Sequence, residues 1–527
     1  MKKLTARQRI KKMIDANSRS ADAKSKKTDR LKQIITKLSV TKPQTGALGR
    51  IQSQNGEIIS DPKQMSRHLI SFFKAWFGEG RKNRWNVNPD GTSAHPLNNR
   101  DARGLKLVEA LLVGNYYEIA KEGEELPEVV KQLYDRGLLS YKTNKDGNCL
   151  SEKEVGSIRA SFSPEEWLAA RTSKVKKCTH PGADKITKPA LFYCSEEIFQ
   201  ELGTIVFLAE ELGYIIKQHK VVQMWLIPKD AGFEKIDRLR PLWFESDILK
   251  MKEFVIESRV DKLLRKKGML EPEQSGFEKN RDCGAAIFPV AQLIEDSRVR
   301  NRQLWVAFLD QMKAFDTLES FQGKLMASMV LGLPFKYANQ LVKFDESVIA
   351  SIITAYGTTE EILGFAEGTF TPECGGLQGG PRSPGMWKRF YDLLIRAQKL
   401  IKTGKLAYIQ GEDGEIILTA KVFADDTALF SGDHENMAAR AFVQQLLIDY
   451  SGSSCRAHKC ILTAILYDAS GNLKRPAARN NLPFRDINTG ISEMCSMLSP
   501  NDRFRYLGWF SCMSFSTDQS FNQLFEQ

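Results

Sequence analysis

The 527-residue sequence lacks the long apolar segments of membrane proteins. No apolar run reaches the roughly 18 residues that a transmembrane helix needs. The N-terminus also lacks the apolar core of a signal peptide. We therefore expect an intracellular protein that works without a membrane.

Cysteine is sparse and irregularly spaced. The nine cysteines, an odd number, are Cys149, Cys178, Cys194, Cys283, Cys374, Cys455, Cys460, Cys495 and Cys512. This pattern argues against a disulfide framework and indicates reduced thiols. Cys455, His458 and Cys460 fit no common zinc-finger spacing, so we expect no zinc site there.

Acidic residues are outnumbered by basic ones, and the formal net charge is +12. A basic balance favours a polyanionic partner, although charge alone does not separate nucleic acid from a membrane surface. Residues 1–45 hold 14 Lys or Arg against three Asp, which predicts a basic disordered arm. RNA clamping, nuclear import, organelle transit and a plain solvated tail stay open as its role.

One pair of acidic residues lies between two short, β-prone apolar runs. Asp425 and Asp426 follow residues 422–424 and precede residues 427–430, the pattern of a strand, a tight turn and a second strand. Adjacent carboxylates repel each other, and a divalent cation removes that conflict. Carboxylate oxygens suit Mg²⁺, which also takes phosphate oxygens from a substrate. The turn therefore predicts half of a metal site for phosphoryl chemistry.

The other half is predicted upstream. Residues 304–309 form an apolar run suited to a buried strand, and Asp310 ends it. A carboxylate there, opposite an acidic hairpin, can hold two cations about 3.5–4 Å apart. Between the two motifs, residues 375–384 are rich in glycine, which permits close approach of another chain such as a template strand. The alternatives are a surface turn for the acidic hairpin, a helix cap for Asp310 and a flexible loop for the glycines. Each alternative is plausible for its own segment, but not for all three segments together.

These motifs resemble the palm motifs of reverse transcriptases, most closely the non-LTR retrotransposon enzymes of the long interspersed element type. The matching segments are residues 308–316, Gly379 with Ser383-Pro384, and residues 423–426. Ala424 is typical of reverse transcriptases, where viral RNA polymerases usually carry glycine. The resemblance extends over about residues 50–510 through further segments: 56–73, 180–186, 226–229, 239–242, 273–277, 458–460 and 504–508.

The resemblance implies an α/β (α+β) fold. It would be a right-hand polymerase with fingers, an antiparallel palm sheet, a partly helical N-terminal extension and a thumb that is mostly absent. The implied divisions are 1–45 basic arm, 46–220 N-terminal extension, 221–480 fingers and palm, and 481–527 primer-grip hairpin and start of a truncated thumb.

Local patterns predict three helices in these divisions. Ser163 is expected to cap a helix that starts at Pro164. A second helix carries Leu249 to Leu263 and ends near Gly268. A third has apolar residues recurring every three or four positions, and this stripe is expected to be core: Ile198, Leu202, Ile205, Leu208, Leu212 and Ile215.

The resemblance also implies site residues. Asp310, Asp425 and Asp426 are the implied catalytic residues and ligands of two Mg²⁺ ions, with Mn²⁺ as an alternative. Phe315 is the implied steric gate, whose ring takes the space that a ribose 2′-hydroxyl needs. The other implied substrate contacts are Lys229 and Arg240 with the triphosphate, Gln378 and Gly379 with the nascent base pair, and Lys459 with the pyrophosphate.

The chain departs from the family pattern in the glycine-rich loop. Leu377 stands where the family commonly has Arg or Lys, and Arg382 stands where it commonly has Leu. Residues 385–388 are Gly-Met-Trp-Lys where the family is usually apolar. These changes leave the metal site intact and bear on template handling. Gln274 and Phe277 either shape the template path or pack the fingers.

The implied function is an RNA-directed DNA polymerase that extends a primer 3′-hydroxyl with dNTPs. Its partners would be an RNA template and a DNA primer or target, in the nucleus if the host is eukaryotic, with an organelle location left open. No segment resembles an endonuclease, a zinc knuckle or RNase H, so a separate endonuclease or a longer element is expected. The alternatives are a decayed remnant that binds RNA and a group II intron-like maturase, which would need a splicing domain after the palm.

Overall fold

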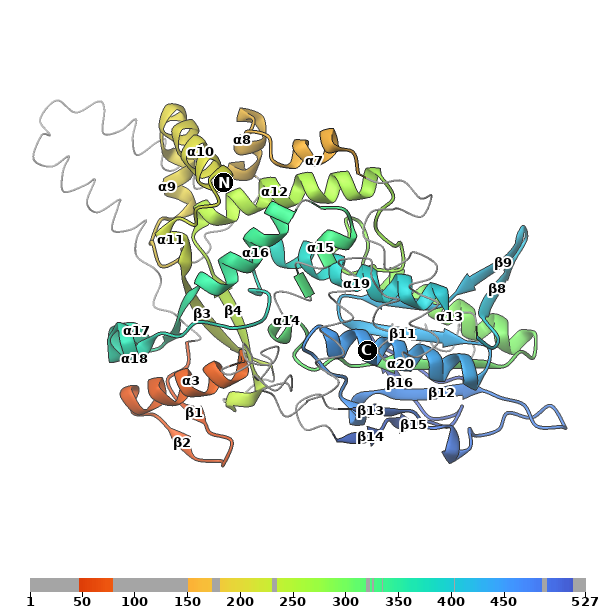
Figure 1. Cartoon of the computed structure of the whole chain (residues 1–527). Helices are drawn as coiled ribbons and strands as arrows, with labels where there is room; N and C mark the ends of the chain where they lie inside the picture. Colours follow the sequence, from red (N-terminus) through yellow and green to blue (C-terminus); the bar gives the residue numbers. More distant parts are fainter. Residues whose placement is uncertain are drawn as a thin grey trace, which may run out of the picture.

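The computed structural model contains two main sheets and the helices that cover them (Figure 1). It describes residues 47–78, 150–172, 181–229, 235–318, 323–324, 327–333, 335–401, 403–485 and 491–514. The arm expected at residues 1–45 lies outside the described residues, as do Cys149 and Cys178. The expected mixed α/β class is confirmed. Within the described ranges, no helix is long and apolar enough to cross a membrane, and no disulfide joins the seven described cysteines.

The larger sheet has five strands in the order β10-β11-β5-β12-β15. They are β5 (Leu304–Leu309), β10 (Ala420–Phe423), β11 (Asp426–Ser431), β12 (Ile461–Ile465) and β15 (Ser496–Met497). The first four pair antiparallel, and β15 runs parallel to β12. All six residues of the central strand β5 are buried, so the buried strand predicted there is confirmed.

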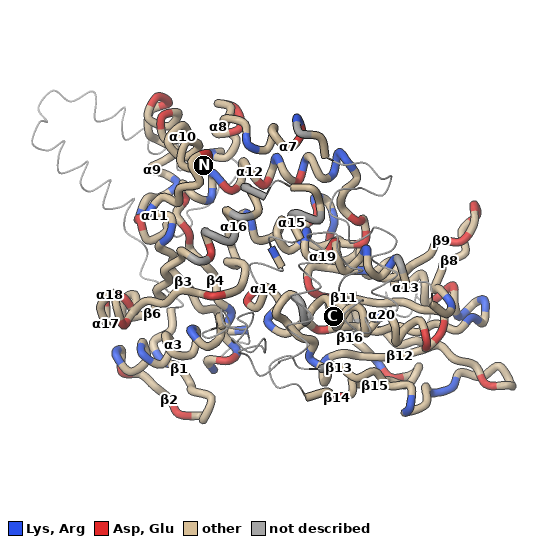
Figure 2. Tube along the Cα trace, viewed as in Figure 1, with Lys and Arg blue, Asp and Glu red and all other residues tan. Residues whose placement is uncertain are grey.

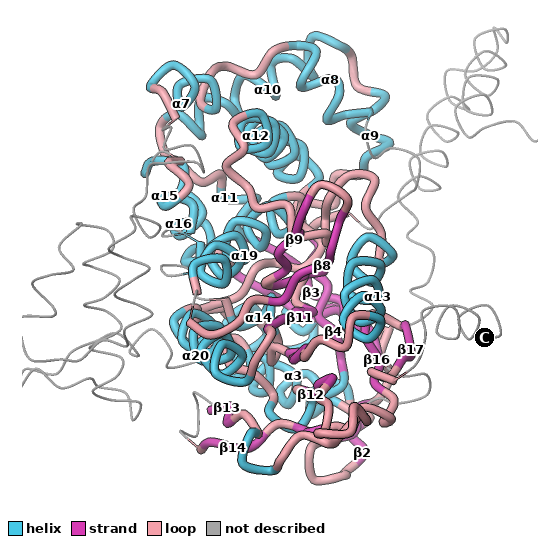
Figure 3. The backbone as a smooth tube through the Cα atoms, turned by 90° about the vertical axis from the view of Figure 1, so that its right-hand side faces the viewer, coloured by secondary structure: helices cyan, strands magenta, loops and turns pink. Residues whose placement is uncertain are grey.

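Helices cover both faces of this sheet, which Figure 3 shows edge-on. Helices α19 (Arg382–Leu400) and α20 (His434–Tyr450) lie on one face, and α13 (Gly284–Val299) lies on the other. Residues 305, 307 and 309 of β5 join the core under α19 and α20, whereas residues 304, 306 and 308 join the core under α13. Alternate side chains of a strand point to opposite faces, so a strand between two helical layers reads as an unbroken apolar run.

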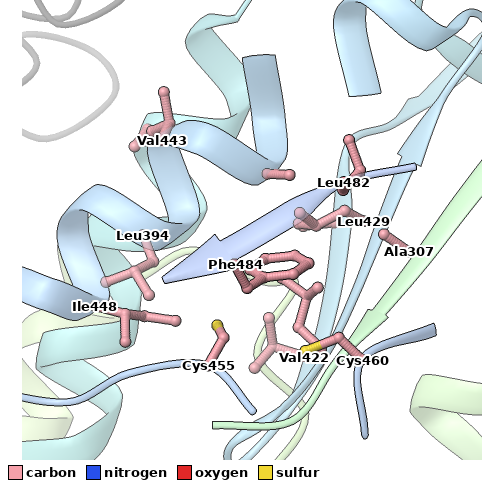
Figure 4. Close-up of a cluster of buried hydrophobic side chains, with 14 of the residues drawn as sticks. Ala307, Leu394, Val422, Leu429, Val443, Ile448, Cys455, Cys460, Leu482 and Phe484 are labelled. Atoms are coloured by element: carbon pink, nitrogen blue, oxygen red, sulfur yellow. The ribbon is translucent and has the colours of Figure 1, made fainter. Parts of the chain in front are cut away.

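The core under α19 and α20 lies directly behind the acidic hairpin. Figure 4 shows Phe484 among side chains of the sheet and of both helices, including Leu429, Leu394 and Ile448. Val422 of β10 belongs to the same cluster and is 1% exposed. Strand β10 is therefore anchored by packing just before the acidic turn begins.

The smaller sheet has four strands in the order β4-β3-β6-β7. They are β3 (Val221–Pro228), β4 (Leu239–Phe244), β6 (Ile349–Thr354) and β7 (Gly357–Thr358). Helix α3 (Pro62–Trp76) packs on this sheet, and Leu69 and Phe73 join one core with Val222 and Met224. The short strands β1 (Ile51–Gln52) and β2 (Ile58–Ile59) precede α3.

A helical layer lies above the smaller sheet in Figure 1. It contains α7 (Glu152–Ile158), α8 (Pro164–Thr172), α9 (Lys188–Tyr193), α10 (Glu196–Glu211), α11 (Lys217–Lys220) and α12 (Asp247–Lys266). The predicted start of α8 is confirmed, since the Ser163 hydroxyl accepts a hydrogen bond from the Glu166 amide at 3.2 Å. The predicted end of α12 is also confirmed, and Gly268 follows it with a φ of +61°.

The stripe predicted to be core on α10 is mostly exposed, although Leu202 and Ile215 pack at the edges of core clusters. Three of its residues are 50–59% exposed: Ile198, Ile205 and Leu208. The helix buries Phe199, Gly203 and Val206. A Cβ on Gly203 would lie 2.9 Å from Trp167 Nε1. The buried face of α10 can therefore pack against Trp167 only because residue 203 is a glycine. The prediction was wrong because α10 has apolar residues on two faces, and periodicity alone cannot show which one packs.

The remaining elements are short helices and peripheral hairpins. The strands β8 and β9 form an antiparallel hairpin at the edge of the molecule. The helices are α14 (Ala314–Thr317), α15 (Ala327–Val330), α16 (Phe335–Ser347), α17 (Thr359–Leu363) and α18 (Phe365–Gly368). The strands are β8 (Ala407–Gly411), β9 (Gly414–Leu418), β13 (Pro483–Arg485), β14 (Ser492–Met494), β16 (Phe504–Tyr506) and β17 (Trp509–Ser511).

Candidate active site

The acidic pair lies at a tight turn between β10 and β11, as the sequence predicts. Phe423 pairs with Asp426 across the ladder, which leaves Ala424 and Asp425 as the two turn residues. Ala424 has a φ of +59°, in the left-handed region that residues other than glycine rarely adopt. The turn therefore needs contacts that hold Ala424 in place.

Two side chains supply those contacts by binding the Ala424 backbone. Gln274 Oε1 accepts from the Ala424 amide at 3.0 Å, and Gln274 Nε2 donates to the Ala424 carbonyl at 3.2 Å. Trp387 Nε1 donates to the same carbonyl at 2.9 Å. A Cβ on Gly276 would lie 2.2 Å from the Ala424 nitrogen, so only glycine fits there. Gln274 thus holds the acidic turn, a contact that neither of the expected alternatives included.

Asp310 lies at the same edge of the sheet as the turn. Leu309 pairs with Thr427, so Asp310, the next residue after β5, comes beside the start of β11. Its main chain is fixed, because the Arg456 amide donates to the Asp310 carbonyl at 2.9 Å. Its carboxylate lies 3.9 Å from Lys459 Nζ. The structure therefore brings Asp310, Asp425, Asp426 and Lys459 into one region.

The two turn carboxylates repel each other and Asp310. Burial raises the pKa of Asp425, and the negative charge of Asp310 adds to this shift. Asp426 is exposed at the turn, yet desolvation by the surrounding elements, followed by the charges of Asp425 and Asp310, raises its pKa to about 6. Both groups are therefore easier to protonate than an isolated aspartate, mainly because they are desolvated and further because neighbouring carboxylates repel them.

The donor chemistry of this region suits a divalent cation, because carboxylate oxygens are the preferred ligands of Mg²⁺. A cation would also relieve the repulsion that raises both pKa values. The geometry is less complete. Among the described residues, no group of three or more His, Cys, Asp or Glu side chains lies close enough to hold a metal ion. The metal assignment therefore rests on donor chemistry and on sheet register.

Phe315 lies behind the acidic turn in a stack of aromatic rings. Its ring centroid is 4.3 Å from that of Trp387 with an interplanar angle of 25°, and it meets Phe277 edge-on at 5.7 Å. Trp387 thus contacts both Phe315 and the carbonyl of Ala424. Phe277 packs beside Phe315, so its side chain borders the site. The sequence marked Trp387 only as a departure from the family pattern.

Two cations of the smaller sheet face the acidic turn. Lys229 follows β3, and Arg240 lies in β4 opposite Ile227. The positive charges of Arg240 and Lys229 oppose the rise in the pKa of Asp425, which burial causes, so both act on that carboxylate. Burial lowers the pKa of Lys229 itself, and the nearby charge of Arg456 adds to that effect.

A basic cavity of about 810 Å³ opens next to these residues. Cationic side chains from segments that flank strands of both sheets line it: Lys229, Arg238, Lys313, Arg456 and Lys459. In Figure 2, stretches of Lys and Arg lie along the chain between α3 and the near ends of β3 and β4. A cavity with this charge suits a polyanion such as a triphosphate or a nucleic-acid backbone.

The glycine-rich loop packs against the protein itself. A Cβ on Gly375 would lie 2.8 Å from the Asp316 carbonyl oxygen, and one on Gly380 would lie 2.7 Å from Glu245 Oε2. The glycines are expected from the sequence to give room for another chain, whereas Gly375 and Gly380 are needed for internal packing. Gly379 is exposed with a φ of +110°, and the neighbouring Gln378 donates to the Asp316 carboxylate at 3.0 Å.

Arg382, a departure from the family pattern, is buried beneath this loop. It is 3% exposed and lies 3.4 Å from both Glu253 and Asp345. Neighbouring Arg389 is paired with Glu257 at 2.8 Å. These acids come from α12 and α16, far from the loop in sequence. Arg382 therefore belongs to a buried charge cluster that the sequence pattern could not reveal.

No protein-family model matches the chain. The chain is 25% identical over 342 residues, 64% of its length, to the Retrovirus-related Pol polyprotein from type-2 retrotransposable element R2DM of Drosophila melanogaster. It is 25% identical over 359 residues, 68% of its length, to the corresponding polyprotein from type-1 retrotransposable element R2 of Nasonia vitripennis. The matched regions span 29% and 32% of those two relatives. These similarities support a retrotransposon-related protein.

Proposed function

We propose that this chain is a reverse transcriptase, an RNA-directed DNA polymerase that extends a primer 3′-hydroxyl with dNTPs on an RNA template. The observation that carries this proposal is the meeting of Asp310 with the Asp425-Asp426 turn beside a basic cavity. In the right-hand polymerase arrangement, the five-stranded sheet is the palm and the β3–β4 region belongs to the fingers. Similarity to retrotransposon Pol polyproteins supports the same function.

Asp310 and Asp425 would hold Mg²⁺, or Mn²⁺ in its place, with Asp426 as a third carboxylate near the ions. When bound, the ions would neutralise charge on the reacting phosphate. Rigid positioning supplies much of the catalysis in phosphoryl transfer. Gln274 and Trp387 contribute by holding Ala424 and therefore the acidic turn.

The remaining site residues would bind and select the nucleotide. Lys229 and Arg240 face the acidic turn and would bind the triphosphate, and Lys459 would stabilise the pyrophosphate beside Asp310. Phe315 is backed by Trp387 and would block a ribose 2′-hydroxyl. Gln378 and Gly379 would line the nascent base pair.

A second candidate function is RNA binding without catalysis. The absence of a preassembled three-ligand group among the described residues favours it. Primer extension on an RNA template with Mg²⁺ separates the two functions. A reverse transcriptase extends the primer with dNTPs in preference to rNTPs. An RNA-binding remnant retains the primer–template in a salt-sensitive complex and extends nothing.

A further inference from the structure

Helix α3 belongs to the same core as the smaller sheet. Its start is fixed by Asp61, whose side chain accepts from the Gln64 amide at 2.8 Å, and by Pro62 in the first turn. Its buried face packs on β3 and β4 through one continuous apolar cluster. A helix held in this way can fix the position of a side chain at its last residue, Trp76.

Trp76 reaches the nucleotide side of the proposed site. Its Nε1 donates to Asp316 Oδ2 at 3.2 Å in a buried contact between residues 240 positions apart. The other carboxylate oxygen, Asp316 Oδ1, accepts from Gln378 Nε2 at 3.0 Å. A single carboxylate thus joins the last residue of α3 to the glutamine of the glycine-rich loop.

Other contacts hold the same end of α3 against the site. Lys313 Nζ lies 3.4 Å from the centroid of the Trp76 ring, a cation–π contact. The Phe77 carbonyl accepts from the Glu373 amide at 3.0 Å and from Cys374 Sγ at 3.2 Å. Trp76 also lines the basic cavity together with Lys229 and Lys313. The segment before the polymerase motifs therefore forms part of the cavity wall.

We propose that Trp76 is a positioning residue for the nucleotide, acting through Asp316 on the side-chain amide of Gln378. The proposal rests on the proposed polymerase function. It extends the nucleotide site to residues 47–78, which the sequence assigned to an N-terminal extension.

The chemistry of the linkage follows from the donor and acceptor inventory. An ionised carboxylate only accepts hydrogen bonds, so Gln378 must turn its NH₂ group toward Asp316. Its amide oxygen and second N–H are then left for the base pair that Gln378 lines. Without Trp76, Asp316 Oδ2 loses a buried donor, and Asp316 is free to turn and release the amide. Burial raises the pKa of Asp316 to about 6, so losing a donor also favours its neutral form.

The test compares two tryptophan variants in steady-state primer extension. Trp76→Phe keeps an aromatic ring and removes the N–H donor together with the pyrrole part of the indole, a loss of volume that the control variant shares. Trp167→Phe is the matched control, because Trp167 is also buried and its Nε1 donates to the Phe199 carbonyl at 2.8 Å in the helical layer away from the site. We expect Trp76→Phe to raise the KM for dNTP about tenfold with kcat within about threefold, since a hydrogen bond to a charged group is lost. The Trp167→Phe variant should leave the KM unchanged.

A double-mutant cycle in urea unfolding gives a readout that does not need catalysis. Asp316→Asn offers one acceptor oxygen in place of two, so one of its donors loses its partner. We expect Trp76→Phe and Asp316→Asn to be non-additive by at least about threefold in the unfolding equilibrium constant.

Equal KM values in the Trp76→Phe and Trp167→Phe variants, with an active wild-type chain, would overturn the nucleotide role of Trp76. A wild-type chain that extends no primer would overturn the proposed function and the nucleotide role with it. In that case the double-mutant cycle still tests whether Trp76 and Asp316 are coupled. Additive effects on unfolding would show that they are not.

Discussion

Acidic side chains gather in two regions of the molecule, and the two regions differ in whether cations are paired with these acids. Beneath the glycine-rich loop, Glu253 and Asp345 are paired with the buried Arg382. At the β10–β11 turn, the structure gives Asp425 and Asp426 no ion-pair partner among the described residues, and neutral groups hold only the backbone. The acids around Arg382 are paired internally, whereas Asp425 and Asp426 have no such cation beside them, as the proposed metal site requires.

The first prediction concerns the loss of Arg382 from the buried charge cluster. Arg382→Leu would remove the cation that lies beside the buried Glu253 and one of the two cations of Asp345, which also pairs with Lys324. We expect the free energy of unfolding to fall by about 3–5 kcal/mol. The measurement is urea unfolding followed by circular dichroism. Arg300→Leu is the matched control, because Arg300 pairs with Asp296 while about half exposed, and removing such a pair costs about 0–1 kcal/mol. An Arg382→Leu protein as stable as the wild type would contradict a structural role for the cluster.

The second prediction loosens the turn without touching a carboxylate. Gln274→Ala removes both side-chain hydrogen bonds to Ala424, so Asp425 moves relative to Asp310. We expect primer extension to fall about 100-fold, the effect of a misplacement of about 1 Å. The control is Gln398→Ala, since Gln398 is also buried and donates to the Arg440 carbonyl at 3.0 Å near the C-terminal end of α19, three turns from Trp387. Equal activity in the two variants would show that the clamp is not needed.

These elements also show how far the sequence predicts this protein. The strand at 304–309 and the acidic hairpin are predictable, because a buried strand and a tight turn are encoded by neighbouring residues. The pairing of Trp76 with Asp316 is not predictable, since it joins residues 240 positions apart through a packed helix. Arg382 was noted only as an oddity for the same reason, because its partners lie on α12 and α16. The apolar stripe of α10 was misassigned because the helix has a second apolar face, and that face packs against Trp167 at Gly203.

The third prediction concerns the aromatic stack behind the turn. Trp387→Phe keeps a ring against Phe315 but loses the hydrogen bond to Ala424, so the gate and the turn are no longer joined. We expect the use of rNTPs relative to dNTPs to rise about threefold to tenfold, as the loss of about 1 kcal/mol of positioning implies. Single-nucleotide incorporation with each substrate measures this ratio. The Trp167→Phe protein should keep the wild-type ratio, and an unchanged ratio in Trp387→Phe would separate the gate from the turn.

The fourth prediction concerns the pH dependence of the effect of Mg²⁺ on stability. Burial and like charge raise the pKa of Asp426 from 3.8 to about 6. The stability linked to this shift is fully present below the unfolded-state pKa and is lost as the pH rises through about 6. A divalent cation binds the deprotonated form, so we expect Mg²⁺ to raise the melting temperature at about pH 7.5 and to have little effect at about pH 5. NaCl at matched ionic strength is the control, and an equal Mg²⁺ effect at both pH values would contradict the site.

The most direct test of the account is primer extension on an RNA template by wild-type protein and by the Asp425→Ala variant, with unfolding measured in parallel. The account predicts extension by wild type that the variant loses by at least roughly 1,000-fold. It also predicts that the variant is as stable as the wild type or more stable, because a repelled carboxylate has been removed. Undiminished extension by Asp425→Ala, or a loss of activity explained by unfolding, would contradict the claim that these carboxylates keep their charge for catalysis.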